Sequence, residues 1–107
     1  MIKIVYYRKY NRVTVTGHAL AGEPGHDLVC AGCSAIACTL AANVQQMEMD
    51  GYARYAVTKL EPGDAEIACK PKSRYAAIAE LIFTSVCVGF EFLAASHPHY
   101  ISYEIHE

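Results

Sequence analysis

Five short stretches of the chain alternate apolar and polar residues, which is the period of a β-strand. They cover residues 2–7, 12–16, 52–60, 64–70 and 101–106. The first two are separated only by residues 8–11 and predict a β-hairpin. The third and fourth predict another hairpin, because Pro62 and Gly63 suit the two central positions of a type II turn. The alternation therefore predicts two hairpins and a closing strand.

Two longer segments repeat apolar residues every three or four positions, which is the period of an α-helix. The first is expected over about residues 28–48, with Asp27 as its N-cap and Gly51 just after its end. Its expected core stripe is Val29, Cys33, Ile36, Leu40, Val44 and Met47. The second is expected over about residues 74–94, with Ser73 as its cap. Apolar residues cover more than one of its faces, so we expect this helix to be sandwiched or to lie in a subunit interface.

The predicted elements follow the order ββαββαβ along residues 1–107. A chain of 107 residues has the length of one small domain. An α+β fold, with one mostly antiparallel sheet covered by two helices, would bury the apolar side of every element. We therefore expect a single domain with this architecture.

Composition and charge limit the cellular compartment and the classes of partner that we expect for this protein. Nine basic and eleven acidic residues give a formal charge of −2, and no basic stripe points to direct contact with nucleic acid. The first residues lack the anatomy of a signal peptide, and no apolar run looks long enough to span a bilayer. We therefore expect a cytoplasmic protein without a membrane partner. A reducing compartment favours free thiols for the five cysteines over a disulfide framework.

One stretch of the chain places a histidine and a cysteine on the two sides of a loop. His18 follows the second predicted strand, and Cys30 falls in the first turn of the first helix. The segment 19–26 between them has no periodicity and contains the loop residues Gly22, Gly25 and His26. The helix N-terminus favours a thiolate at Cys30, and the backbone amides of Cys30 and Ala31 are candidate donors to a substrate oxyanion. This pattern predicts a nucleophile, Cys30, served by an acid/base group, His18.

Other roles stay open for these residues. Most cysteines in a reducing compartment are buried and inert, and a strand-end histidine often has only a local hydrogen bond. Cys30-x-x-Cys33 also fits a redox pair or, together with His26, a metal site. The place of Cys33 on the core stripe favours burial instead. We expect no metal and no cofactor.

Two polar residues near the predicted pair are candidates for supporting roles. Asp27 is expected first of all to cap the helix, and it could alternatively orient His18. Ser34, one helical turn beyond Cys30, could hydrogen-bond near the site or within its own helix.

Three motifs contain these candidates: Gly17-His18-Ala19, Gly25-x-Asp27-Leu28-Val29-Cys30-Ala31 and Ser34. In these motifs, and in its length and element order, the chain resembles the ribosomal-processing cysteine proteases, the Prp family of small bacterial proteins. The resemblance implies a catalytic dyad of Cys30 and His18, a homodimer, and a loop over 19–26 that closes on substrate. It also implies a cysteine endopeptidase that removes a short N-terminal extension from a large-subunit bacterial ribosomal protein, cutting just after aromatic side chains. One departure is Cys33, which adds a second thiol and raises the question of whether oxidation silences the enzyme.

Two other functions compete with this prediction. The same fold could serve as a non-catalytic, ribosome-associated module that binds a peptide without cutting it. Alternatively, Cys30 and Cys33 could make the chain a thiol redox or metal protein. Peptide cleavage, thiol reactivity and metal analysis distinguish the three.

Overall fold

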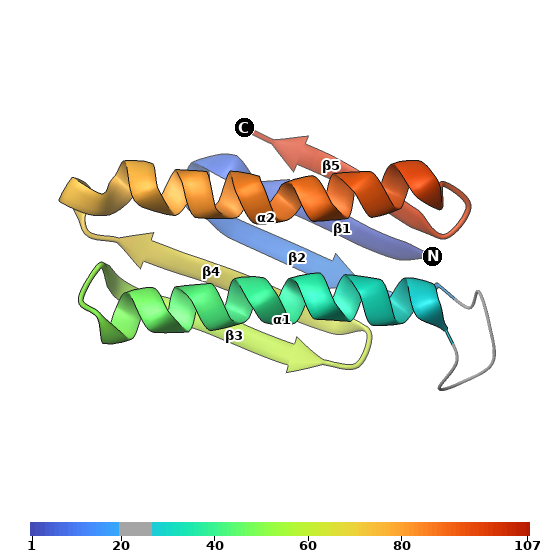
Figure 1. Ribbon diagram of the computed structural model, residues 1–107, viewed down its shortest axis with the longest axis horizontal. Coiled ribbons are helices and arrows are strands. Elements are labelled where there is room, and N and C mark those ends of the chain that lie inside the picture. The colour runs from blue at the N-terminus through green and yellow to red at the C-terminus, as the bar shows by residue number, and fades with distance from the viewer. Residues whose placement is uncertain (20–26) are drawn as a thin grey trace.

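The computed structural model describes residues 1–19 and 27–107, which form two layers (Figure 1). One layer is a five-stranded sheet made of β1 (Ile2–Tyr7), β2 (Arg12–Thr16), β3 (Ala53–Glu61), β4 (Asp64–Pro71) and β5 (Ile101–His106). The other layer consists of α1 (Leu28–Met49) and α2 (Ala76–Ser96), which lie side by side on the same face of the sheet (Figure 1). The predicted α+β class and the order ββαββαβ are confirmed.

The strand order in the sheet is β3-β4-β2-β1-β5. Both predicted hairpins form, and β5 completes the sheet by pairing parallel to β1. The pairing that matters most for the site is the antiparallel one between β2 and β4, in which Thr16 lies opposite Asp64. It brings the end of β2 next to the turn between β3 and β4, two segments far apart in the sequence.

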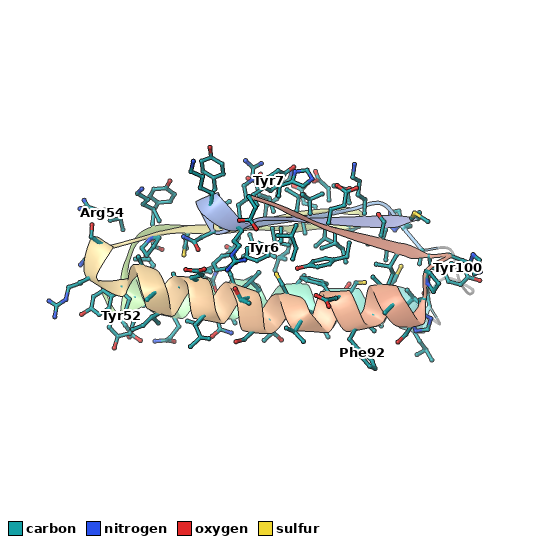
Figure 2. All side chains as sticks on the ribbon, turned by 90° about the horizontal axis from the view of Figure 1, so that it is seen from above. Tyr6, Tyr7, Tyr52, Arg54, Phe92 and Tyr100 are labelled. Carbon is teal, nitrogen blue, oxygen red and sulfur yellow. The ribbon has the colours of Figure 1, made fainter. Side chains whose placement is uncertain are left out.

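The core lies between the helices and one face of the sheet. Tyr6 points into this layer, whereas its neighbour Tyr7 points to the open face of the sheet (Figure 2). In α1 the buried residues are Val29, Cys33, Ala37, Leu40, Ala41, Val44 and Met47. Of the expected stripe, Ile36 is only partly buried and packs against the edge of the core. The predicted burial of Cys33 is therefore confirmed, with 2% of its surface exposed.

The ends of the first helix agree with the sequence prediction, but the start of the second does not. The Asp27 side chain accepts hydrogen bonds from the first turn of α1, and Gly51 follows the helix with a φ of +80°. Ser73 does not cap α2, because it begins a short 3-10 turn, Ser73–Tyr75, that precedes the helix. The N-cap residue is Tyr75, whose side chain makes no capping hydrogen bond.

Both helices are more apolar than the sequence inspection suggested. By length and composition alone, α1 and the segment Ser73–Ser96 would each qualify to cross a membrane. The expectation that no run is long enough is therefore wrong on this criterion. The same test is passed by helices that cover a protein core, and the buried residues of α1 belong to the hydrophobic core cluster shared with the sheet.

Candidate active site

The strand end that carries His18 is fixed by two backbone hydrogen bonds. The amide of Gly17 donates to the carbonyl oxygen of Gly63 at 2.9 Å, which ties the end of β2 to the β3–β4 turn. The amino group of Met1 donates to the carbonyl oxygen of His18 at 2.7 Å. The backbone around the histidine is therefore held on both sides, although its side chain is exposed.

Glycine is required at two positions around this histidine. Gly63 has a φ of +70°, and a Cβ atom added there would lie only 2.5 Å from Nε2 of His18. Gly17 has a φ of +90°, and an added Cβ would overlap the carbonyl oxygen of Met1. The imidazole therefore occupies space that exists only because residue 63 has no side chain.

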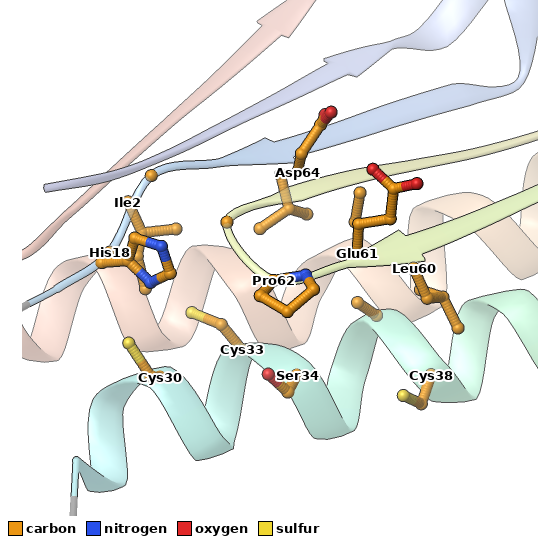
Figure 3. A pocket seen from close by; sticks show the side chains of 15 residues that line it. Ile2, His18, Cys30, Cys33, Ser34, Cys38, Leu60, Glu61, Pro62 and Asp64 are labelled. Atoms are coloured by element: carbon orange, nitrogen blue, oxygen red, sulfur yellow. The ribbon is translucent and has the colours of Figure 1, made fainter. Parts of the chain in front are cut away.

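Cys30 lies in the first turn of α1, and Asp27 organises that turn. One carboxylate oxygen of Asp27, Oδ1, accepts from the amides of Val29 and Cys30, each at 3.0 Å. This confirms the predicted N-cap. The thiol of Cys30 is half-buried and faces the strand end that carries His18 (Figure 3).

A backbone amide points at the sulfur of Cys30. The N–H of Ala19 donates to Sγ of Cys30 at 3.4 Å, and Ala19 itself is 5% exposed. The Ala19 amide is thus directed at the sulfur atom of Cys30, which accepts its hydrogen bond. Ala19 therefore does not belong to an open loop, as the lack of periodicity suggested, but packs into the core.

His18 and Cys30 line one pocket of about 430 Å³. Figure 3 shows the imidazole facing the first two turns of α1, from which the sulfur atoms of Cys30 and Cys33 point toward it. The other pocket-lining residues come from β1, the end of β2 and the residue after it, α1, and the β3–β4 hairpin with its turn. They are Ile2, Val15, Gly17, Ser34, Ala37, Cys38, Leu60, Glu61, Pro62, Gly63, Asp64 and Ala65. The fold thus assembles a thiol, an imidazole and an apolar wall around one cavity.

The predicted oxyanion donors are already engaged in this structure. The N–H of Cys30 donates to the Asp27 side chain, and the N–H of Ala31 donates to the Asp27 carbonyl oxygen at 3.0 Å. The residue that orders the helix start therefore uses the amides that the sequence suggested for substrate. Among the described residues, the amide that does face the sulfur is that of Ala19.

Besides Cys30, four residues of α1 line the pocket, namely Cys33, Ser34, Ala37 and Cys38. Ser34 and Cys38 are exposed, whereas Cys33 is buried. Burial raises the pKa of Cys33 to about 11, and negative charge at Cys30 and Asp27 adds to this shift. Cys33 therefore stays protonated at neutral pH.

Part of the predicted site lies outside the described residues. Gly22, Gly25 and His26, the residues named for the substrate loop, fall in the segment 20–26. Within residues 1–19 and 27–107, no group of three or more His, Cys, Asp or Glu side chains is placed to hold a metal ion. The five cysteines are all free thiols.

Two parts of the site have no signal in the sequence. Ala19 contributes a backbone amide, which any residue type would supply. Pro62 and Gly63 read as an ordinary turn, and their place beside His18 depends on the pairing of β2 with β4. Only a correct prediction of the β2–β4 pairing would have placed Pro62 and Gly63 beside His18.

Comparison with known proteins identifies the family. The family model of the cysteine protease Prp matches residues 1–102 of the chain. The chain belongs to the Prp cysteine protease family. It is therefore a cysteine protease of the ribosomal-processing Prp family.

Solved structures agree with the Prp fold over nearly the whole chain. The ribosomal processing protease Prp from S. aureus, in complex with a covalently linked product peptide, has a TM-score of 0.70 and 23% identity, covering 97% of this chain and 96% of that one. The same S. aureus protease with a substrate peptide gives a TM-score of 0.66 and 22% identity, with the same coverage. SMU.848 from Streptococcus mutans gives a TM-score of 0.65 and 22% identity, covering 98% of this chain and 91% of that one. No curated protein matches the chain in sequence.

Proposed function

We propose that this Prp-family protease removes a short N-terminal extension from a large-subunit bacterial ribosomal protein, with Cys30 as nucleophile and His18 as acid/base group. The observation that carries this proposal is the shared pocket of the two side chains. The S. aureus protease, at 22–23% identity, has been solved with a covalently linked product peptide and with a substrate peptide, and its likeness to this chain adds support at the level of the fold.

The first step is attack on the peptide bond. The sulfur of Cys30, as a thiolate, adds to the carbonyl carbon at the cut, and the carbonyl oxygen takes on the negative charge. We assign the Ala19 amide, which donates to the sulfur before substrate binds, as the donor to this oxygen. Helix capping by Asp27 keeps the nucleophile in place during attack.

His18 completes the cycle by moving protons. The imidazolium protonates the leaving amine, the C–N bond breaks, and the N-terminal fragment remains as a thioester on Cys30. The neutral imidazole then takes a proton from water, and the resulting hydroxide attacks the thioester. Release of the fragment as a carboxylic acid restores the starting thiolate and imidazolium pair.

The pocket wall supports recognition of a large apolar side chain next to the cut. Ile2, Val15, Leu60 and Pro62 line it together with small residues of α1. Aromatic side chains have the shape and area that such a wall buries well. This agrees with the aromatic residues that the family resemblance implies before the cleavage point.

A homodimer is part of the proposal. Four apolar side chains form one exposed stripe along α2, namely Ile78 (46% exposed), Leu81 (67%), Val88 (58%) and Phe92 (69%). Their spacing keeps them within one sector of the helix, and Phe92 points away from the sheet (Figure 2). A second copy of the chain would remove this stripe from water. The assembled enzyme would act in the cytoplasm, where ribosomal proteins are made.

The experiment is cleavage of the extended ribosomal protein by the wild-type enzyme and three variants. We expect Cys30→Ala to lose the reaction, by roughly 10⁴-fold or more, because the nucleophile is removed. His18→Ala should lose about 10²- to 10⁴-fold, the usual contribution of an acid/base group. Cys38→Ala is the matched control, because this exposed cysteine lies on the same helix and lines the same pocket.

The outcome also decides between a protease and a binding module. Full activity of Cys30→Ala would overturn the assigned nucleophile. Tight peptide binding without cleavage by the wild-type protein would favour the non-catalytic module. Activity that depends on an added metal would favour the metal protein instead.

A further inference from the structure

Cys30 has a second thiol one helical turn away. Cys33 follows it at position i+3 on α1, and both line the pocket of about 430 Å³. Helix geometry places the Cα atoms of residues i and i+3 about 5 Å apart. This separation lies inside the range of about 4.4–6.8 Å that a disulfide bridges. In Figure 3 the two sulfur atoms point to the same side of the helix.

The two thiols differ sharply in their surroundings. Cys30 is half-buried, lies in the first turn and accepts a hydrogen bond from an amide. Cys33 is 2% exposed and belongs to the hydrophobic core cluster. Burial keeps the pKa of Cys33 near 11, so this thiol does not compete for a soluble oxidant. An oxidant entering the pocket therefore meets the sulfur of Cys30 first.

We propose that Cys33 is a resolving cysteine, which captures oxidised Cys30 in a reversible disulfide and so protects the nucleophile from irreversible oxidation. This inference rests on the proposed role of Cys30 as nucleophile and adds a modification site to it. The oxidant class is a hydroperoxide.

The chemistry balances in two steps. The Cys30 thiolate attacks the terminal oxygen of the hydroperoxide, and the O–O bond breaks. The leaving alkoxide takes the proton of the His18 imidazolium, so that a sulfenic acid and an alcohol (water, for hydrogen peroxide) result. The Cys33 sulfur then attacks the Cys30 sulfur, and the S–O bond breaks. Hydroxide leaves with the proton of Cys33 as water, and the S–S bond forms. Two thiols have lost two electrons to one hydroperoxide.

The enzyme would be inactive as the Cys30–Cys33 disulfide and active once both thiols are reduced. Peptide cleavage stops in the oxidised state, because the nucleophilic sulfur is bonded to Cys33. A dithiol restores both thiols by exchange, and the enzyme returns to activity. Without Cys33, the sulfenic acid would remain open to a second hydroperoxide and pass to sulfinic acid, which a dithiol does not reduce.

The test exposes wild type, Cys33→Ala and Cys38→Ala to hydrogen peroxide and then to dithiothreitol. Each activity is measured relative to that variant's own untreated activity, and circular dichroism checks that each is folded. Cys38 is the matched control, because helix geometry puts its Cα roughly 9 Å from that of Cys33 and 12 Å from that of Cys30, too far for a disulfide. Mass spectrometry after differential alkylation locates any disulfide or sulfinic acid.

We expect wild type and Cys38→Ala to contain a Cys30–Cys33 disulfide and to recover activity. Cys33→Ala should carry sulfinic acid at Cys30 and recover at least about tenfold less. Absence of the disulfide in oxidised wild type, or equal recovery by Cys33→Ala, would overturn the inference. Disulfide mapping needs no substrate, so a failure of the proposed protease function would show separately, as an untreated enzyme that does not cleave.

Discussion

The turn between β3 and β4 makes a sharp prediction about His18. Replacing Gly63 by alanine adds a Cβ atom 2.5 Å from Nε2 of the imidazole, where ordinary contact begins at 3.4 Å. The far end of a histidine side chain can rotate away, so the imidazole must move by about 1 Å. A displacement of this size at a catalytic group costs on the order of 100-fold in rate. We expect Gly63→Ala to lower kcat/KM by about this factor.

The same substitution should affect stability only modestly. A non-glycine residue at a φ of +70° destabilises the folded state by about 1–2 kcal/mol. The alanine also restricts the unfolded chain, and this effect offsets about 0.4–1 kcal/mol of that cost. We therefore expect the free energy of unfolding to fall by about 1 kcal/mol. Activity would thus suffer more than the fold.

The assay compares peptide cleavage and urea unfolding for Gly63→Ala and Gly51→Ala. Gly51 is the matched control, because it has a φ of +80° and the nearest atom to an added Cβ is Nζ of Lys72, at 3.7 Å. The control should lose similar stability and keep its activity. Gly63→Ala with activity within about threefold of wild type would refute the assigned position of His18. An equal loss of activity in both variants would show that backbone strain at a positive φ lowers the activity. It would refute the explanation by contact between the added Cβ atom and the imidazole of His18.

Three further predictions concern the cap, the buried thiols and the outer helix. Asp27→Ala should lower the free energy of unfolding by about 1 kcal/mol in a urea titration, whereas Asp27→Asn should keep both stability and activity if capping is its role. Burial raises the pKa of Cys33, Cys69 and Cys87 from 9.0 to about 11, so the folded state holds these protons more tightly. The stability that these bound protons contribute is fully present below pH 9 and should be lost between pH 9 and 11. Cys69→Ala should therefore show a shallower dependence of the urea midpoint on pH in this range. Phe92→Asp should convert the proposed dimer to a monomer in analytical ultracentrifugation, while an unchanged dimer would place the interface elsewhere.

Local patterns were sufficient to predict most of the fold. Alternation marked the strands, the i, i+3, i+4 spacing marked α1, and Asp27 and Gly51 marked its ends within a residue. The prediction that Ser73 caps the second helix was wrong, because Ser73 begins a short 3-10 turn. The helix α2 therefore starts at Ala76, two residues later than a cap at Ser73 implies. The parallel pairing of β5 with β1 has no local signature, since it depends on how α2 crosses the sheet.

The sequence predicts those parts of the site in which the residue type itself indicates the chemistry. A cysteine in a first helical turn and a histidine at a strand end are visible in the sequence, and the fold brings both to one pocket. The donor role of Ala19 is a backbone property, and the room that Gly63 leaves for the imidazole of His18 depends on strand pairing. The oxyanion prediction treated the amides of Cys30 and Ala31 as free, although the Asp27 cap that the sequence also predicted uses both of them.

The central claim is that the sulfur of Cys30 attacks the peptide carbonyl. Acid quenching during turnover, followed by mass spectrometry of the digested enzyme, tests this directly by locating the covalent thioester. We expect the N-terminal substrate fragment on Cys30 in wild type and in Cys38→Ala, and none in Cys30→Ala. A fragment attached to another residue, or rapid cleavage by Cys30→Ala, would contradict the account.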